Sequence, residues 1–243
     1  MNTCLAHKEG QAVSGASTQA LGEAACAFIS QKLQAAIDVR GHASLMVSGG
    51  SSPKPLFAAL SEQDIAWEAV TISLVDERWV EPGEAGSNET FIKEHLLIGK
   101  AAKARFISLK SKHESVEAGL ETIEARFADI AAPFDVCVMG MGLDGHTASW
   151  FPNAKGREAA MAADNKARFA YVDAAGCAGA GAFTDRITLT LSAVMDSRSI
   201  VLFIPGEAKS TLFASVSVET ISSAPAAALK LAGARLAVFS GPT

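Results

Sequence analysis

An apolar run near the middle of the chain limits the fold more than any other stretch. The run extends from Phe134 to Met139 and ends in Gly140 and Gly142, with Asp144 and His146 just beyond it. Buried strands of parallel sheets contain such runs, and glycine lets the backbone turn sharply where the strand ends. In open α/β sheets, ligands bind outside the carboxyl ends of the strands. Asp144 and His146 are therefore the first candidates for chemistry.

Strand and helix patterns alternate along the rest of the chain. Further strand candidates are Ser44–Val47, Val70–Val75, Arg105–Leu109, Arg168–Ala174, Ile187–Leu191, Ile200–Ile204 and Arg235–Phe239. Helices are expected over Ser17–Val39, after Pro53, through Phe91–Leu96, over Val116–Phe127, around Ser149 and from Glu207. The alternation predicts an α/β fold with a doubly wound, mostly parallel, Rossmann-like sheet and helices on both faces. Residues 1–243 are expected to form a single domain.

The composition excludes several classes of protein. Charged residues make up 19% of the chain and hydrophobic residues 49%, as in a compact folded protein. The net charge of -5 argues against a broad interface with nucleic acid. The four cysteines are widely spaced without a CxxC pair, and the sequence has neither a secretory-signal pattern nor an apolar stretch of roughly 20 residues. The expected setting is the cytoplasm, with reduced cysteines and no membrane contact.

The first strand-to-helix connection has the composition of a phosphate-binding loop. A polar stretch, Ser48–Ser52, precedes Pro53, and proline is favoured in the first turn of a helix. Backbone N–H groups at such a helix start face anions, helped by the positive end of the helix dipole. The candidate donors are the N–H groups of Gly49, Gly50, Ser51 and Ser52. Because the loop is neither a GxGxxG nor a Walker motif, a plain turn is the alternative.

A second strand end carries opposite charges. The run Val70–Val75 is followed by Asp76 and Arg78, and the polar pair Ser87 and Asn88 precedes the next helical pattern. One interpretation is a structural ion pair between Asp76 and Arg78. The other is a site in which Arg78 binds an anion and Asp76 holds a hydroxyl group or a catalytic proton.

Two more cations accompany strands in the second half of the chain. Arg186 directly precedes a strand pattern, and Lys209 falls in the first turn of a helix that begins near Glu207. A lysine there opposes the helix dipole, which costs about a few tenths of a kcal/mol unless an anion lies nearby. Lys209 is therefore either a phosphate ligand or a solvated side chain.

Brought to one sheet edge, these groups would form a pocket for a small phosphorylated sugar. The loop amides, the arginines and Lys209 would bind phosphate, while His146 and the carboxylates would transfer protons. Other chemistries have weaker support, because the sequence has no GxSxG nucleophile motif, no HExxH or paired-cysteine zinc spacing and no complete dinucleotide fingerprint. No metal and no cofactor are expected.

Taken together, the motifs resemble the 6-phosphogluconolactonase family of the wider glucosamine-6-phosphate isomerase/deaminase superfamily. The matching segments are SGGSSP (Ser48–Pro53), VDERWV (Val75–Val80), SNE (Ser87–Glu89), GMGLDGHTASWFP (Gly140–Pro152), RITLT (Arg186–Thr190), GEAK (Gly206–Lys209) and PAAAL (Pro225–Leu229). They occur in the family's order and span nearly the whole chain after about the first forty residues. The segments Asn153–Arg157 and Ala174–Ala182 do not follow the family pattern, and no substrate contact is assigned to them.

The segment after His146 separates two activities within the superfamily. The deaminases are similar around the DGH triplet but continue in an HIAFNEP-like run that contains a catalytic glutamate. Here the run is HTASWFP, without that glutamate. The resemblance therefore favours a lactonase over a deaminase.

The resemblance implies hydrolysis of 6-phospho-D-glucono-1,5-lactone in the oxidative pentose phosphate pathway. His146 would act as general base toward water and then as general acid toward the leaving ring oxygen. Asp144 and Asp76 are the carboxylates that would orient His146 or a substrate hydroxyl, and which one does which is left open. The candidates for substrate and phosphate binding are Gly49, Gly50, Ser51, Ser52, Arg78, Ser87, Asn88, Arg186 and Lys209.

The expected partner is a small phosphorylated sugar lactone, bound by a monomer or a small homo-oligomer. A deaminase or isomerase of an amino sugar phosphate is one alternative, and ammonia release would identify it. A non-catalytic sugar-phosphate sensor is another, and it would bind the ligand without accelerating its spontaneous hydrolysis.

Overall fold

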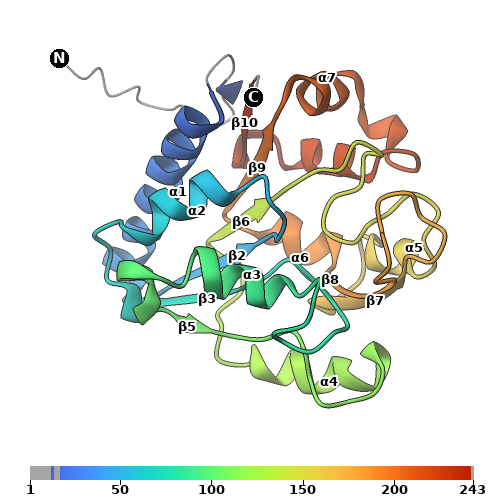
Figure 1. The fold of residues 1–243 in the computed structure, drawn as a ribbon, viewed down its shortest axis with the longest axis horizontal. Coiled ribbons are helices and arrows are strands. Elements are labelled where there is room, and N and C mark those ends of the chain that lie inside the picture. Colours follow the sequence, from blue (N-terminus) through green and yellow to red (C-terminus); the bar gives the residue numbers. More distant parts are fainter. Residues whose placement is uncertain (1–11, 14–16, 242–243) are drawn as a thin grey trace.

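A parallel sheet forms the centre of the computed structural model, which describes residues 12–13 and 17–241 (Figure 1). In these residues its strand order is β1-β10-β9-β6-β2-β3-β5, and all neighbouring strands pair in parallel. The strands are β1 (Ala12–Val13), β2 (Ala43–Val47), β3 (Val70–Leu74), β5 (Arg105–Phe106), β6 (Val136–Met139), β9 (Ser199–Pro205) and β10 (Leu236–Gly241). The predicted α/β fold with a mostly parallel sheet is therefore confirmed.

The interior strands consist largely of apolar residues because both of their faces are covered. Every residue of β2, β6 and β9 is buried. The charged residue just before β6, Asp135, is also buried, and it accepts a hydrogen bond from the backbone N–H of Ser44 at 2.9 Å. Its carboxylate pairs with Arg40 and, at 3.4 Å, with Arg198. Pairing and hydrogen bonding offset the cost of burying this charge.

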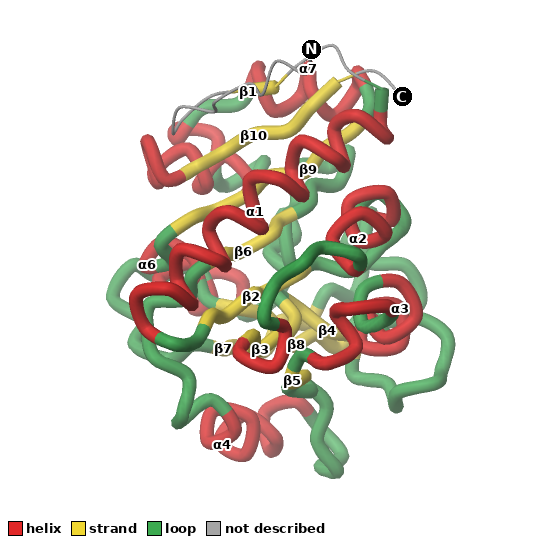
Figure 2. Tube along the Cα trace, turned by 90° about the vertical axis from the view of Figure 1, so that its left-hand side faces the viewer, coloured by secondary structure: helices red, strands yellow, loops and turns green. Residues whose placement is uncertain are grey.

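Helices cover the sheet. The helices are α1 (Thr18–Arg40), α2 (Lys54–Ser61), α3 (Asn88–His95), α4 (Val116–Arg126), α5 (Arg157–Ala160), α6 (Leu191–Asp196) and α7 (Glu207–Ser215), with 3-10 turns η1 (Trp67–Ala69), η2 (Gly99–Lys103), η3 (Val218–Thr220) and η4 (Pro225–Arg235). Figure 2 shows α1 crossing one face of the sheet, where it contacts β2, β9 and β10. Ser17 caps its start by accepting from the N–H of Ala20, and Gly41 ends it in the left-handed region. None of the helices in the described ranges is long and apolar enough to cross a membrane.

A second, antiparallel sheet lies beside the first one. It has the order β4-β8-β7 and consists of β4 (Asp76–Arg78), β8 (Asp185–Leu189) and β7 (Phe169–Asp173). Asp76 and Arg78 follow the end of a strand as predicted, but they form a strand of their own and pair with β8 rather than lying in a loop. The chain leaves the parallel sheet at Val75, whose N–H still bonds the carbonyl of Val47, and enters the second sheet directly.

Two other local expectations are wrong. The strand predicted over Ile187–Leu191 ends at Leu189, because Thr190 caps α6 by accepting from the N–H of Ala193. Both faces of this strand are buried, since Ile187, Thr188 and Leu189 are all 0% exposed. Ser149 lies in a tight turn rather than a helix. The indole Nε1 of the next residue, Trp150, donates to the carbonyl of Leu189 in β8 at 2.9 Å.

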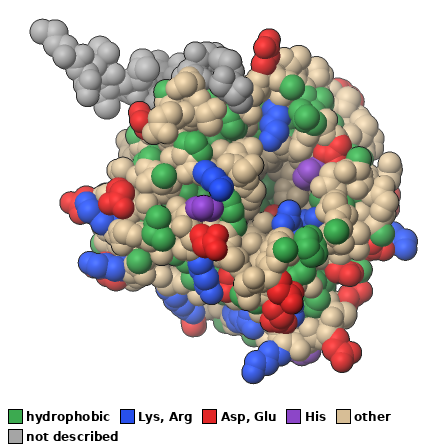
Figure 3. Space-filling model, viewed as in Figure 1, with side chains coloured by type: hydrophobic (Ala, Val, Ile, Leu, Met, Phe, Trp, Pro, Cys, Tyr) green, Lys and Arg blue, Asp and Glu red, His purple; other side chains and the backbone are tan. Residues whose placement is uncertain are grey.

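The carboxyl ends of the central strands meet at one edge of the sheet. Val47 of β2 pairs with Val138 of β6, and Met139 of β6 pairs with Leu202 of β9. The loops that follow these strands therefore start side by side. Figure 3 shows that this face of the molecule is hollowed near its centre, with basic and histidine side chains around the hollow.

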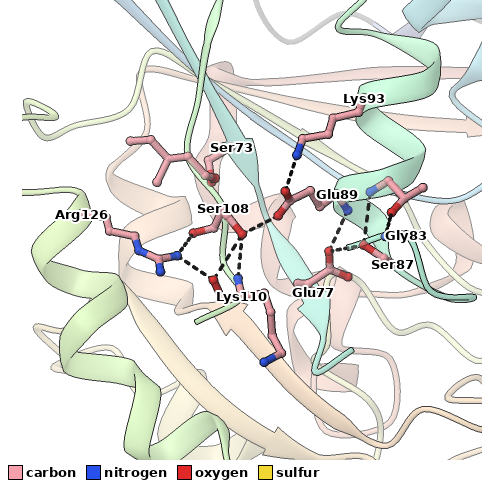
Figure 4. Close-up of polar contacts among 11 residues, drawn as sticks. Ser73, Glu77, Gly83, Ser87, Glu89, Lys93, Ser108, Lys110 and Arg126 are labelled. Carbon is pink, nitrogen blue, oxygen red and sulfur yellow. Dashed lines mark hydrogen bonds and ion pairs between the residues drawn. The ribbon is translucent and has the colours of Figure 1, made fainter. Parts of the chain in front are cut away.

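A buried carboxylate joins β4 to the start of α3 (Figure 4). Glu77 is 0% exposed. Its Oε1 accepts from the backbone N–H groups of Arg78 and Asn88 at 2.8 and 2.7 Å, and its Oε2 accepts from that of Glu89 at 2.7 Å. The carboxylate thus lies at the positive end of α3, where it satisfies N–H groups that have no partner within the helix. Glu77 fixes the relative position of two elements that carry predicted site residues.

The next glutamate extends this contact to the edge of the sheet (Figure 4). Lys93 Nζ lies 2.6 Å from Oε1 of Glu89, and Ser108 Oγ donates to Oε2. Arg126 of α4 donates to the carbonyls of Ser108 and Lys110 at 2.8 and 2.7 Å. These contacts tie α3 to the segment after β5 and to α4.

Burial raises the pKa of Glu77 to about 7 from an ordinary value of 4.5, although three backbone N–H groups favour its charged form. The folded state therefore holds this proton more tightly than the unfolded state does. Between pH 4.5 and 7, wild type should lose stability relative to Glu77→Gln, at up to about 1.4 kcal/mol per pH unit, because glutamine keeps an acceptor oxygen and cannot ionise. Urea denaturation of both proteins across this range measures the difference, and a constant difference would contradict the expectation.

Candidate active site

A cavity of about 290 Å³ opens at the carboxyl ends of β2, β6 and β9. All predicted site residues line it except Asp144 and Ser87. Those lining residues are Gly49, Gly50, Ser51, Ser52, Asp76, Arg78, Asn88, His146, Arg186 and Lys209. Groups that lie far apart in the sequence therefore meet in one hollow of a size that suits a small ligand.

His146 and Asp144 form a hydrogen-bonded pair at one side of the cavity. Nδ1 of His146 lies 2.5 Å from Oδ1 of Asp144, and the backbone N–H of His146 donates to the same oxygen at 3.2 Å. Burial opposes the ionisation of Asp144, but the hydrogen bonds from His146, and the charge of its ring when protonated, hold the pKa of Asp144 below the ordinary value. With Nδ1–H donating to the carboxylate, Nε2 of the neutral ring carries the lone pair. The ring can therefore accept a proton on the cavity side.

A compact turn presents this pair. The backbone N–H of Gly142 donates to the carbonyl of His146 at 2.9 Å, and Gly145 adopts a φ of 79°, which favours glycine. A side chain at Gly145 would collide with Ala224, since a Cβ would lie 2.8 Å from its Cα. The Phe151 ring packs on the imidazole with 4.3 Å between ring centroids. The turn and the aromatic ring restrict the orientation of His146.

Asp76 has different partners from Asp144. Its Oδ2 accepts from Ser149 Oγ at 2.6 Å and lies 3.8 Å from Nη1 of Arg186. The carboxylate is 6% exposed and lines the cavity. Asp144 is therefore the carboxylate in contact with His146, whereas Asp76 faces the ligand space from the second sheet.

The phosphate-loop candidates lie opposite, at the start of α2. Within the described part of the chain, the backbone N–H groups from Gly49 to Ser52 donate to no protein group. Lys209 approaches the same loop, with Nζ 3.3 Å from Ser52 Oγ. Burial lowers the pKa of Lys209, so that an anion nearby would stabilise its charged form. Free amides and a half-buried ammonium group are suited to bind phosphate.

The other predicted polar residues divide into two groups. Asn88 lines the cavity, where Nδ2 donates to the carbonyl of Asp76 at 2.9 Å and Oδ1 leaves no room for a side chain at Gly49. Ser87 lies outside it and caps α3, with Oγ accepting from the N–H of Thr90 at 3.2 Å. Ser87 does not line the cavity with the other site residues, because its hydroxyl donates to Oε2 of Glu77 at 3.3 Å and caps the helix.

The two arginines also differ in their free donors. Arg186 is 2% exposed, and its Nε and Nη2 donate to the carbonyls of Phe183 and Ala180, both at 2.7 Å. Burial lowers the pKa of Arg186 to about 10, although the negative charge of Asp76 favours the charged guanidinium and acts to raise the pKa. Arg78 donates through Nη1 to the carbonyl of Gly86, while its buried Nε has no partner among the described residues. Arg78 therefore has more capacity to bind a ligand in the cavity.

Sequence reasoning missed two features of the site. Gly179 lines the cavity from a Gly/Ala-rich segment to which no role was assigned. Glu77 supports two site elements, and its place between Asp76 and Arg78 was a signal that the sequence offered. In residues 12–13 and 17–241, no group of three or more His, Cys, Asp or Glu side chains could hold a metal ion.

Known proteins match this chain over most of its length. A 6-phosphogluconolactonase of Rhizobium meliloti (strain 1021) is 41% identical over 195 residues, which cover 80% of this chain and 82% of the relative. A 6-phosphogluconolactonase of Pseudomonas aeruginosa is 40% identical over 205 residues, which cover 84% and 83% of the two chains.

Solved structures share the fold. The crystal structure of a 6-phosphogluconolactonase from Shewanella baltica OS155 has a TM-score of 0.86 and 36% identity, covering 97% of this chain and 99% of that one. A monomeric glucosamine-6-phosphate deaminase has a TM-score of 0.73 at 15% identity, which supports a common fold alone. The sequence profile described as glucosamine-6-phosphate isomerases/6-phosphogluconolactonase matches residues 16–238. The chain belongs to this family.

Proposed function

We propose that this protein hydrolyses 6-phospho-D-glucono-1,5-lactone to 6-phospho-D-gluconate in the oxidative pentose phosphate pathway. The observation that carries the proposal is that an Asp-supported histidine and a set of candidate phosphate donors line the same cavity. The relatives named 6-phosphogluconolactonase, at about 40% identity over most of the chain, support the same activity. The run HTASWFP, without the glutamate of the deaminases, favours a lactonase over an amino sugar deaminase.

His146 is the general base in this proposal. Nε2 takes a proton from water as the water oxygen attacks C1 of the lactone, and a tetrahedral oxyanion forms. Collapse of this intermediate breaks the bond between C1 and the ring oxygen, which receives the proton back from Nε2. Asp144 holds the ring through Nδ1 and stabilises the imidazolium formed between the two steps.

The remaining groups bind the substrate. The amides from Gly49 to Ser52, together with Lys209, hold the phosphate. The unpartnered Nε of Arg78 supports a role for Arg78 in binding an anionic oxygen, either of the phosphate or of the tetrahedral intermediate. Asp76 and Asn88 line the cavity, where they can bind sugar hydroxyl groups.

The described cysteines fit a reducing compartment. Cys26, Cys137 and Cys177 are free thiols, and Cys137 is fully buried in β6. We therefore place the protein in the cytoplasm. We also treat residues 1–243 as one catalytic domain, since segments from Ser48 to Lys209 line the same cavity.

His146→Ala should lower lactone turnover by at least about a hundredfold, the usual scale of general acid–base catalysis. Proton release in a pH-stat, corrected for spontaneous hydrolysis of the lactone, measures the rate. The matched control is His113→Ala, since His113 is exposed and does not line the cavity. Near-normal turnover by His146→Ala would rule out the assigned role. Ammonia release from glucosamine 6-phosphate by the wild type would instead indicate a deaminase.

Lys209→Ala should raise KM for the phosphorylated lactone by about tenfold or more, because a charge-assisted hydrogen bond is lost. Any residual hydrolysis of unphosphorylated glucono-1,5-lactone should be unchanged, since that substrate has no phosphate to bind. Steady-state kinetics on both lactones test the contrast, with the exposed Lys103 as a control for loss of charge. Equal losses on both substrates would show that Lys209 is not a phosphate ligand.

A further inference from the structure

The segment from Ala174 to Phe183, between β7 and β8, lies against the proposed catalytic pair. A Cβ placed on Gly179 would be 2.7 Å from Oδ2 of Asp144 and 2.8 Å from Nδ1 of His146. Gly179 does not have a positive φ, so a left-handed backbone is not what requires glycine at this position. Glycine is needed here because the segment approaches the pair closely, rather than because the backbone turns.

Arg186 holds this segment in place. Its guanidinium donates to the carbonyls of Ala180 and Phe183, both at 2.7 Å, and is almost fully buried. At the other end the backbone N–H of Ala174 donates to the carbonyl of Thr184 at 3.0 Å. These buried contacts fix the position of Gly179 against the pair, although residues 174–182 are all small.

The segment also affects the environment of Asp144. Oδ2 of Asp144 is buried and has no hydrogen-bond partner within the described part of the chain. All contacts of the carboxylate with donors go through Oδ1, to the ring and the backbone of His146. A carboxylate with its second oxygen shielded from water interacts more strongly with the remaining donor. Displacing the segment would admit water and weaken the bond to His146.

We propose that the 174–183 segment is a positioning element for lactone hydrolysis, which holds the Asp144–His146 pair in its reactive geometry through Gly179. Gly142, in the segment Gly140–Pro152, packs against the pair in the same way, since a Cβ there would lie 2.3 Å from Nδ1 of His146. The imidazole and the carboxylate are therefore confined between two glycines from distant parts of the chain. The kinetic role rests on the function proposed above, whereas the confinement does not.

The test is Gly179→Ala, which adds one methyl group against the pair. The substitution should leave the stability of the fold nearly unchanged, because the atoms that the methyl group displaces belong to two side chains at the cavity rather than to the core. We expect kcat to fall by about tenfold or more, KM for the phosphorylated lactone to stay within about twofold, and the thermal unfolding midpoint to stay unchanged. Ala178→Ser, at the exposed neighbouring position, should behave as wild type.

Proton NMR gives a readout that does not depend on activity. In wild type and Ala178→Ser, the Nδ1–H of His146 should give a strongly downfield resonance, as in a short Asp–His hydrogen bond, and Gly179→Ala should shift or abolish it. Normal kcat with an unchanged resonance in Gly179→Ala would overturn the inference, and so would a loss of kcat that only follows a lower unfolding midpoint. If the wild type lacks lactonase activity the proposed function fails, while the resonance still tests the confinement.

Discussion

Parallel pairing of β2, β6 and β9 is the constraint on which the site depends. Because these strands run in the same direction, their carboxyl ends and the loops that follow them lie at one edge of the sheet. The first loop supplies amides at the start of α2, the second the His146 turn, and the third Lys209. No single loop contains a complete site, and the parallel sheet brings the loops together.

Buried polar contacts then set the positions of the side chains. Glu77 joins β4 to α3, Arg186 joins β8 to the 174–183 segment, and Asp144 holds the ring of His146. Burying each of these groups costs free energy, which hydrogen bonds or an opposite charge offset, although Oδ2 of Asp144 has no partner among the described residues. The charged groups around the site thus hold its elements and side chains in position, while Lys209 and the loop amides keep free donors for a ligand.

The sequence predicted the parallel sheet, and most of the site residues that it indicated line the cavity, because these features depend on local sequence patterns. Apolar runs marked the buried strands, and glycine, proline and charge at the strand ends marked His146, Asp76 and Lys209. Ser87 was assigned to ligand binding although it caps a helix, since a serine before a helical pattern fits both roles. The second sheet was missed because β4 has only three residues. Gly179 gives no sequence signal, because its effect is a close approach that only the folded chain creates.

A crystal structure of the protein with bound 6-phospho-D-gluconate would test the central claim, that one cavity joins a phosphate site to an Asp-supported general base. The account predicts the phosphate on the N–H groups from Gly49 to Ser52 and on Lys209, with the C1 carboxylate within hydrogen-bond reach of Nε2 of His146. A phosphate bound elsewhere, or a C1 carboxylate directed away from His146, would contradict it.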